Sequence, residues 1–299
     1  MPRRPTGTAR SGATEPIRGA GRPPLLCRAR TLGSRARIDI PADEWSDTDL
    51  LVFTTDASRW LGDGRWLDDI GRVVLTFVEP TALAGLLERR VLFDGAVDVD
   101  MVIIPIDAIE NVISDAGAIP VLARGYRLLV DKDDRFGDLA GRAAAADARA
   151  IHGAAPWPPT AEEVSNLIRD YLYHCVWVTK KLRRGELAVA VSCQNAYQGA
   201  TIRRFVEWQA GARSNVATNT YYDGRFLERW ADPETVTGLT VTQAAYDVDD
   251  LGRSIVESME LFRGLASEVA DAVRVAYPGE AHAWIRNWVR GTLSEAQSR

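Results

Sequence analysis

Aspartates at alternate positions are the residues of this sequence best suited to carry out chemistry. Asp47 and Asp49 flank Thr48 at the start of an apolar run, and residues two apart in a strand point to the same face. Two carboxylates on one side repel each other unless a cation lies between them, and such oxygen ligands suit Mg²⁺ together with substrate phosphates. The spacing alone equally fits a solvated start of a strand.

A second pair, Asp98 and Asp100, leads into the apolar run at 101–105. An acidic residue beside such a run needs either water or a buried partner. If this strand lies beside the strand of Asp47 and Asp49, one of the two completes an acidic cluster. Otherwise both lie on the solvent face of an amphipathic strand.

Gly33 and Ser34 follow a short apolar segment. A Gly-Ser turn between a strand and a helix can offer backbone N–H groups and a hydroxyl to a phosphate. The pair is common in proteins, so by itself it does not indicate a phosphate site.

The elements that must position these residues form two regions. The first is β-rich, with Asp94-Gly95 as a tight hairpin turn, helical segments such as 106–114 and a polar helix or turn at 66–71. We expect a small mixed sheet with helices on one face. Its strands are expected at 25–32, 48–56, 72–80, 90–93, 97–105 and 126–132.

The second region is helical. Residues 136–160 are rich in Ala, Gly and Pro and read as a linker, after which 161–184 and 254–278 show helical apolar spacing. The sequence therefore predicts an α+β protein, a mixed sheet domain followed by a C-terminal helical bundle. The expected parts are a disordered basic tail at 1–24, the sheet domain at 25–135 and the helical domain at 160–295.

Charge and composition restrict the class of partner. Residues 1–24 hold five arginines and one glutamate, a balance of +4, which leaves −9 for the rest of a chain whose total is −5. An acidic body suits a cationic ligand and argues against nucleic acid. No apolar stretch is long enough for a membrane span.

The three cysteines, Cys27, Cys175 and Cys193, are scattered and show no CxxC spacing. They indicate neither a disulfide framework nor a zinc site. We expect a cytoplasmic protein, acting as a monomer.

The order of these features resembles the layout of the nucleotidyltransferase superfamily. In that layout a strand is followed by Gly-Ser, then by Asp-x-Asp, and then by a third carboxylate on a later strand. TLGSRARIDIPADEWSDTDLLVFTTD in particular resembles the aminoglycoside 6-adenylyltransferases, which modify streptomycin. The resemblance covers most of residues 28–293. It continues through WLDDIGRVVLTFVEP, VLFDG, DMVIIP, LLVDKD, KKLRRGEL, RRFVEW, FLERW, LFRGLASEVADAV and AYP.

The resemblance implies the site residues position by position. Asp47 and Asp49 match the metal carboxylates of the family, and Asp100 rather than Asp98 matches the third. The residues implied to hold the nucleotide phosphates are Gly33, Ser34, Arg35 and, on a helix, Lys180.

The chemistry implied is attack of an antibiotic hydroxyl, the 6-hydroxyl of streptomycin, on the α-phosphorus of ATP, with release of pyrophosphate. Mg²⁺ held by Asp47 and Asp49 would offset charge on the phosphates. Asp100 would either hold a second metal ion or accept the hydroxyl proton. An enzyme that modifies the antibiotic in this way would confer resistance to it.

A polycationic acceptor needs carboxylates and aromatic faces. Asp170, Tyr173 and Trp177 share one helical stripe and can supply both, although the aromatic rings equally fit the core of a bundle. The tryptophan that the family carries near Asp170 is replaced at about Leu172. Two alternatives therefore stay open, the same chemistry on another acceptor and a non-catalytic nucleotide-binding homologue.

Overall fold

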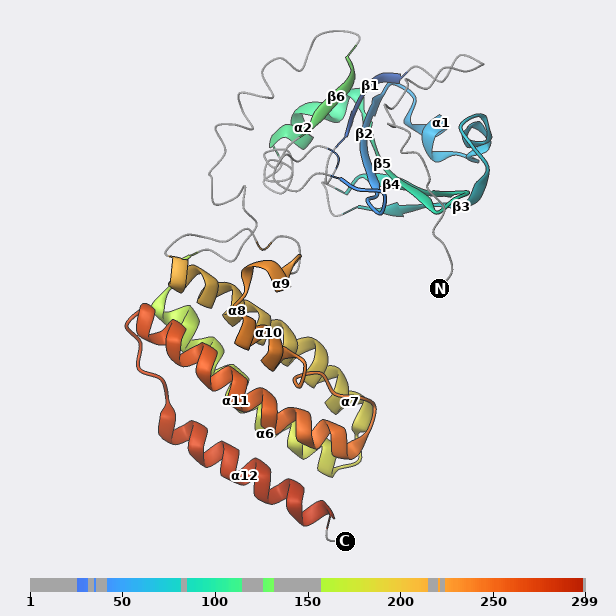
Figure 1. Cartoon of the computed structure of the whole chain (residues 1–299). Helices are drawn as coiled ribbons and strands as arrows, with labels where there is room; N and C mark the ends of the chain where they lie inside the picture. The colour runs from blue at the N-terminus through green and yellow to red at the C-terminus, as the bar shows by residue number, and fades with distance from the viewer. Residues whose placement is uncertain are drawn as a thin grey trace, which may run out of the picture. The chain divides into compact units, whose positions relative to one another are not determined.

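The computed structural model describes residues 26–31, 35, 42–81, 85–114, 126–131, 157–214, 220 and 224–297. The chain divides into two compact units, residues 1–145 and 146–299, each considered by itself (Figure 1). Within the described residues, no helix combines the length and apolar character needed to cross a membrane.

The elements of the first unit are β1 (Leu26–Thr31), β2 (Thr48–Thr54), α1 (Ala57–Leu61), the 3₁₀ turn η2 (Arg65–Asp69), β3 (Val73–Pro80), β4 (Leu87–Phe93), β5 (Val97–Pro105), the 3₁₀ turn η3 (Ile106–Ala108), α2 (Ile109–Ser114) and β6 (Arg127–Asp131). Those of the second unit are α6 (Ala161–Arg183), α7 (Leu187–Ser192), the π-helix η4 (Cys193–Gln198), α8 (Gly199–Ser214), α9 (Leu227–Trp230), α10 (Pro233–Leu239), α11 (Val248–Ala272) and α12 (Gly279–Gln297).

One six-stranded sheet forms the first unit, in the order β3-β4-β5-β2-β1-β6. Its neighbouring strands are antiparallel except for β2 and β5, which are parallel. The predicted α+β class, a mixed sheet followed by helices, is confirmed. Strand β4 begins three residues before the predicted 90–93, because Leu87, Glu88 and Arg89 pair with β5.

Both faces of this sheet are apolar at its centre. On one face a buried cluster consists of Leu51, Phe53, Ile104 and, from α2, Val112. On the other face the cluster consists of Val52, Val91, Met101, Ile103, Trp60 of α1 and Leu67 of η2.

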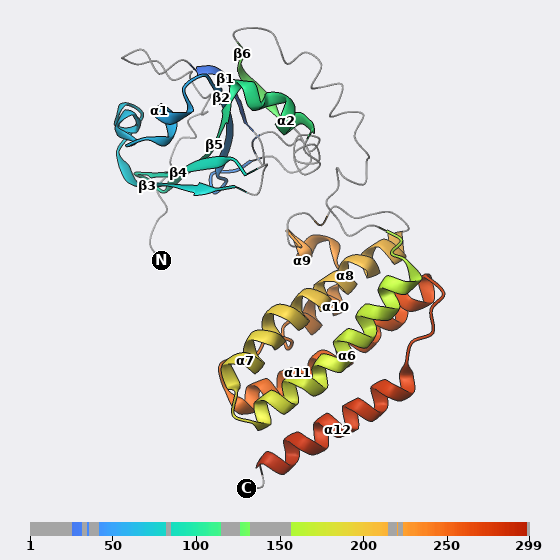
Figure 2. The same ribbon diagram turned by 180° about the vertical axis from the view of Figure 1, so that it is seen from behind.

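The prediction of helices on one face is therefore wrong, since α1 and α2 lie on opposite sides (Figures 1 and 2). The runs at 50–53 and 101–104 are continuously apolar, as strands buried on both faces require.

The hairpin between β4 and β5 turns at Asp94-Gly95, as predicted, but its loop is one residue longer than a tight two-residue turn. Phe93 pairs with Val97, so Asp94, Gly95 and Ala96 form the loop. Gly95 and Ala96 both have positive φ, 79° and 58°. The extra left-handed residue sets the register in which β5 returns along β4.

Helix α6 is defined by polar residues at its ends. The Thr160 hydroxyl accepts a hydrogen bond from the Glu163 N–H at 3.1 Å, which caps the first turn. Acidic residues follow in that turn and basic residues occupy the last, as the helix dipole favours. Gly185, with φ of 77°, ends the helix.

Helices α6, α8, α11 and α12 pack side by side around one core (Figures 1 and 2). Phe262 of α11 stacks on Tyr171 of α6, with ring centroids 3.7 Å apart, and meets Phe205 of α8 edge-on at 4.8 Å. Helix α11 begins six residues before the predicted 254, because Asp247 caps it by accepting from the N–H groups of Asp249 and Asp250.

The π-helix η4 is fixed to the bundle by polar side chains. Gln194 donates to the Ser258 hydroxyl at 2.9 Å and to the Ser254 hydroxyl at 3.2 Å. Asn195 exchanges two hydrogen bonds of 2.8 Å with the backbone of Ala244. These bonds hold the turn that carries Tyr197.

Gly211 of α8 supplies the space for the partly buried indole of Trp157. A Cβ at this position would lie 2.7 Å from Cδ2 of Trp157. We expect Gly211→Ala to lower the free energy of unfolding in urea by about 1–3 kcal/mol. Gly264→Ala in α11 is the matched control, since nothing lies within 4 Å of its added Cβ, and it should gain up to ~1 kcal/mol of helix propensity. Equal stability of the two variants would contradict close packing on Trp157.

His282 of α12 makes the stability of the bundle depend on pH. Its side chain is buried, Nδ1 lies 2.6 Å from the Tyr277 hydroxyl, and burial is the main cause that lowers its pKa. Glu260 opposes this shift, whereas Arg263 and Arg286 add to it.

A lowered pKa in the folded state means that the neutral imidazole contributes stability above the unfolded pKa of 6.5, and that this contribution is lost as the pH falls below it. The free energy of unfolding should therefore fall more steeply from pH 7 to pH 5 in the native protein than in His282→Gln. Parallel pH profiles would show that this histidine is not the titrating group.

Candidate active site

The parallel pairing of β2 with β5 places two aspartates side by side. Asp49 and Asp100 are register partners, and both are partly buried. By alternation they share a face with Leu51 and Phe53, the face that α2 covers further along the strands. Asp98 is exposed. The sheet thus brings Asp100, rather than Asp98, into line with Asp49.

Asp47 lies just before β2 and is exposed. Arg35 holds this segment, because its Nε donates to the carbonyl of Asp47 and its Nη2 to that of Ser46, both at 3.1 Å. One residue predicted to bind phosphate therefore lies beside the predicted metal carboxylates. Gly33 and Ser34 lie outside the described residues.

Arg90 of β4 pairs in register with Asp100 on the side away from Asp49. Its guanidinium lies among three carboxylates. Nη1 is 3.5 Å from Oδ2 of Asp100, Nη2 is 2.8 Å from Oε1 of Glu88, and Nε is 2.6 Å from Oε1 of Glu79. Arg90, Asp100 and Asp49 are consequently neighbours on three adjacent strands.

Burial raises the pKa of Asp100 above its ordinary value. The positive charge of Arg90 opposes this effect, while the negative charges of Glu88, Asp47 and Asp98 add to it. Asp100 therefore lies in an acidic environment that a cation would relieve.

The donor set decides what such a cation can be. Among the described residues, no group of three or more His, Cys, Asp or Glu side chains is arranged to hold a metal ion. Asp49 and Asp100 provide two carboxylates, and Mg²⁺ commonly binds one or two carboxylates together with phosphate oxygens and water. The pair fits a Mg²⁺ shared with a nucleotide and does not amount to a complete protein cage.

On the second unit, the predicted acceptor residue Asp170 lies on α6. The Tyr197 hydroxyl donates to its Oδ2 at 2.9 Å, which raises the pKa of that tyrosine. His174 lies one turn along α6, with its ring centroid 4.6 Å from that of Tyr197. The structure thus surrounds a carboxylate with aromatic rings.

Trp177 is partly buried against the bundle core. The Lys181 ammonium lies over its ring, 5.2 Å from the centroid, and pairs with Glu186 at 2.7 Å. Lys180, predicted to steady the nucleotide, is exposed on the same helix. The roles of Trp177 and Lys180 stay predictions.

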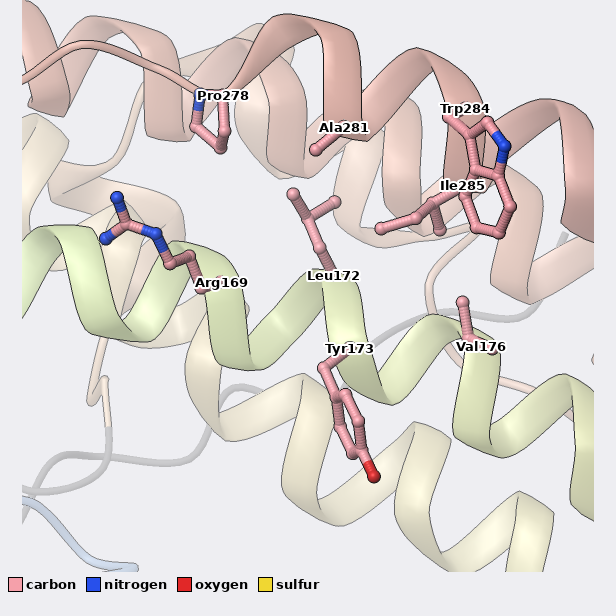
Figure 3. A pocket seen from close by; sticks show the side chains of 8 residues that line it. All are labelled: Arg169, Leu172, Tyr173, Val176, Pro278, Ala281, Trp284 and Ile285. Carbon is pink, nitrogen blue, oxygen red and sulfur yellow. The ribbon is translucent and has the colours of Figure 1, made fainter.

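A groove of about 540 Å³ runs between α6 and α12, lined by Arg169, Leu172, Tyr173, Val176, Pro278, Ala281, Trp284 and Ile285 (Figure 3). Leu172 projects toward α12, whereas Tyr173 points away from it (Figure 3). The lining is apolar apart from Arg169. A groove without a carboxylate and with one cation does not suit a polycationic ligand.

Arg90, His174 and Tyr197 were not predicted from the sequence. Arg90 could have been found from the hairpin, because it lies four residues before the loop at 94–96 and Asp100 lies four residues after that loop, so the two residues pair. Tyr197 has none, since it reaches Asp170 through the π-helix, 27 residues further along the chain.

Comparison with known proteins gives a consistent result. A protein-family model described as streptomycin adenylyltransferase matches residues 28–292. An aminoglycoside 6-adenylyltransferase of Campylobacter jejuni is 24% identical over 258 residues, which cover 82% of each chain. A protein of the same name from Bacillus subtilis is 22% identical over 259 residues, covering 82% of this chain and 84% of its own.

A crystal structure of an aminoglycoside 6-adenyltransferase from Bacillus subtilis aligns with 90% of this chain and 92% of its own, at 19% identity and a TM-score of 0.45.

Arg90 is expected to stabilise the acidic row on the sheet. Replacing it with methionine leaves Glu79, Glu88 and Asp100 without their shared cation, and we expect a loss of about 1–2 kcal/mol in the free energy of unfolding at pH 7. The loss should shrink toward pH 4, because burial raises the pKa of Asp100 and its carboxylate becomes protonated as the pH falls. Arg72→Met is the control, because Arg72 is exposed and only 3.7 Å from exposed Asp94. Equal melting of both variants would rule out this role.

Proposed function

Because the chain belongs to the streptomycin adenylyltransferase family, we propose that it transfers AMP from ATP to a hydroxyl of streptomycin, at the 6-position. It is a nucleotidyltransferase of the aminoglycoside adenylyltransferase type. The co-substrate, the metal ion and the antibiotic are part of the proposal, as is resistance to that antibiotic.

The pairing of Asp49 with Asp100 across two parallel strands is the observation that supports the proposal. Phosphoryl transfer needs positive charge beside the phosphates and a group that takes the hydroxyl proton. Two adjacent carboxylates, with Asp47 close by, supply ligands for the first requirement and a candidate for the second.

At the nucleotide, Asp49 and Asp47 would hold Mg²⁺, which offsets negative charge on the phosphates when bound. Gly33, Ser34 and Arg35 would orient the outer phosphates through backbone and side-chain N–H groups. Lys180 would add a further positive charge.

The reaction forms a bond between the acceptor oxygen and the α-phosphorus and breaks the bond from that phosphorus to the leaving pyrophosphate. Asp100 has two possible roles, since its carboxylate can accept the proton of the attacking hydroxyl or share the metal ion with Asp49.

At the acceptor, Asp170 and Trp177 would bind the antibiotic. A carboxylate that accepts from Tyr197 and is flanked by aromatic rings matches the amines and guanidinium groups of a polycation. The net charge of −9 outside residues 1–24 favours its approach.

The test is pyrophosphate release by the purified protein with Mg²⁺ and ATP, with and without streptomycin, together with the mass of the product. Release that depends on streptomycin and a mass gain of one AMP are expected. Release only with another aminoglycoside would support the alternative of a changed acceptor. ATP binding without any release would support the non-catalytic alternative.

Substitution of the paired aspartates tests the site itself. Asp49→Asn and Asp100→Asn should lower kcat by roughly 10²–10⁴-fold while the melting temperature stays close to that of the native protein. Asp98→Asn is the matched control, because Asp98 is exposed on the same strand, and it should retain kcat within a few-fold. An active Asp49→Asn protein would refute the proposed site.

A further inference from the structure

Asp170 is oriented by two neighbouring side chains. The Tyr197 hydroxyl donates to Oδ2 at 2.9 Å. Nδ1 of His174 lies 2.9 Å from the backbone carbonyl of Asp170, and because a carbonyl only accepts, this nitrogen donates to it. The same Nδ1 is 3.4 Å from Oδ1. The hydrogen bond from Tyr197 thus orients the carboxylate, while His174 bonds the backbone carbonyl of the same residue.

The carboxylate keeps unused acceptor capacity. Each carboxylate oxygen can accept about two hydrogen bonds. Among the described residues, Oδ2 accepts one, from Tyr197, and Oδ1 accepts none. The Asp170 side chain is 35% exposed, so solvent reaches it. Within the part of the chain that the structure describes, no lysine or arginine pairs with it.

Three basic residues on and just after helix α6 are engaged elsewhere. Lys181 pairs with Glu186 and covers Trp177, and Arg184 also pairs with Glu186, at 2.5 Å. Arg169 donates to the carbonyl of Ser165 at 3.2 Å. The negative charge of Asp170 is therefore available to a ligand.

Aromatic rings lie beside the same carboxylate. The rings of His174 and Tyr197 are tilted by 47° with centroids 4.6 Å apart, and Tyr173 meets His174 edge-on at 5.4 Å. Tyr173 and Tyr197 are exposed. A flat cation can therefore stack on an aromatic face while its N–H groups reach the carboxylate.

The π-helix keeps Tyr197 in place before any ligand arrives. Residues Gln194 and Asn195 of the same turn are bonded to α11 and to the segment before it, at 2.9 and 2.8 Å. Because the backbone that carries Tyr197 is already held in place, little conformational entropy is lost when a ligand binds, and the subsite is preorganised.

We propose that Asp170, His174 and Tyr197 form a subsite that selects a guanidinium group of the acceptor over a simple ammonium. The inference rests on the proposed function and adds residues to it. A planar guanidinium presents two parallel N–H donors that match both oxygens of one carboxylate, whereas an ammonium presents a single point charge.

The test is calorimetric binding of streptomycin, which carries guanidinium groups, and of kanamycin, which carries only amines, to the full-length protein. Tyr197→Phe removes the hydroxyl and keeps the ring, and it should raise the Kd for streptomycin roughly tenfold. Asp170→Asn should raise it by more. Tyr246→Phe, at an exposed position on the segment before α11, is the control and should leave Kd unchanged.

Separate effects on KM and on kcat distinguish a loss of substrate binding from a disturbance of the whole fold. Tyr197→Phe should raise KM for streptomycin while kcat at saturation stays within about twofold and the melting temperature is unchanged. Kanamycin affinity should change less than streptomycin affinity in both site variants. Equal loss for the two antibiotics would overturn guanidinium selection.

The outcomes for the subsite and for the reaction are distinct. If the native protein adenylylates streptomycin and both variants bind it normally, the subsite is wrong and the reaction stands. If the native protein binds streptomycin in a manner that depends on Asp170 and Tyr197 yet releases no pyrophosphate, the reaction is wrong and the subsite stands.

Discussion

The register between β2 and β5 is the constraint on which the proposed chemistry depends. Parallel pairing sets Asp49 beside Asp100. The apolar residues that follow each aspartate maintain the register, since their side chains pack into separate clusters on the two faces of the sheet and a slip of one residue would exchange them. Packing energy thus fixes the position of the two aspartates, and the Arg90 guanidinium lies 3.5 Å from the carboxylate of Asp100.

In the helical unit, too, apolar packing fixes the position of an acidic side chain. A tightly packed aromatic core fixes α6, α8 and α11, and polar bonds from Gln194 and Asn195 anchor the π-helix upon them. This rigid frame carries Tyr197 to Asp170, so a solvent-reachable carboxylate is oriented by the fold. Each unit therefore uses buried apolar contacts to present acidic groups, one pair suited to a metal-bound nucleotide and one residue suited to a cation.

Much of the fold follows from the sequence, because strands of alternating or continuous apolar residues and long periodic helices leave clear local patterns. Strand β5 matches the predicted 97–105, and α6 falls within one residue of 161–184. The covering of both sheet faces was missed, although the runs at 50–53 and 101–104 contain the signal. Asp49 and Asp100 were predicted together from a resemblance, whereas Arg90 and Tyr197 depend on strand register and on a π-helix, which no local pattern reveals.

The proposed reaction requires that Asp49, with Asp47 or Asp100 beside it, holds the metal ion of a bound nucleotide. Anomalous diffraction from crystals grown with Mn²⁺ and a non-hydrolysable ATP analogue tests it most directly. We expect an anomalous peak about 2 Å from a carboxylate oxygen of Asp49 and from phosphate oxygens of the analogue. A nucleotide bound with its Mn²⁺ away from Asp49 would contradict the proposal.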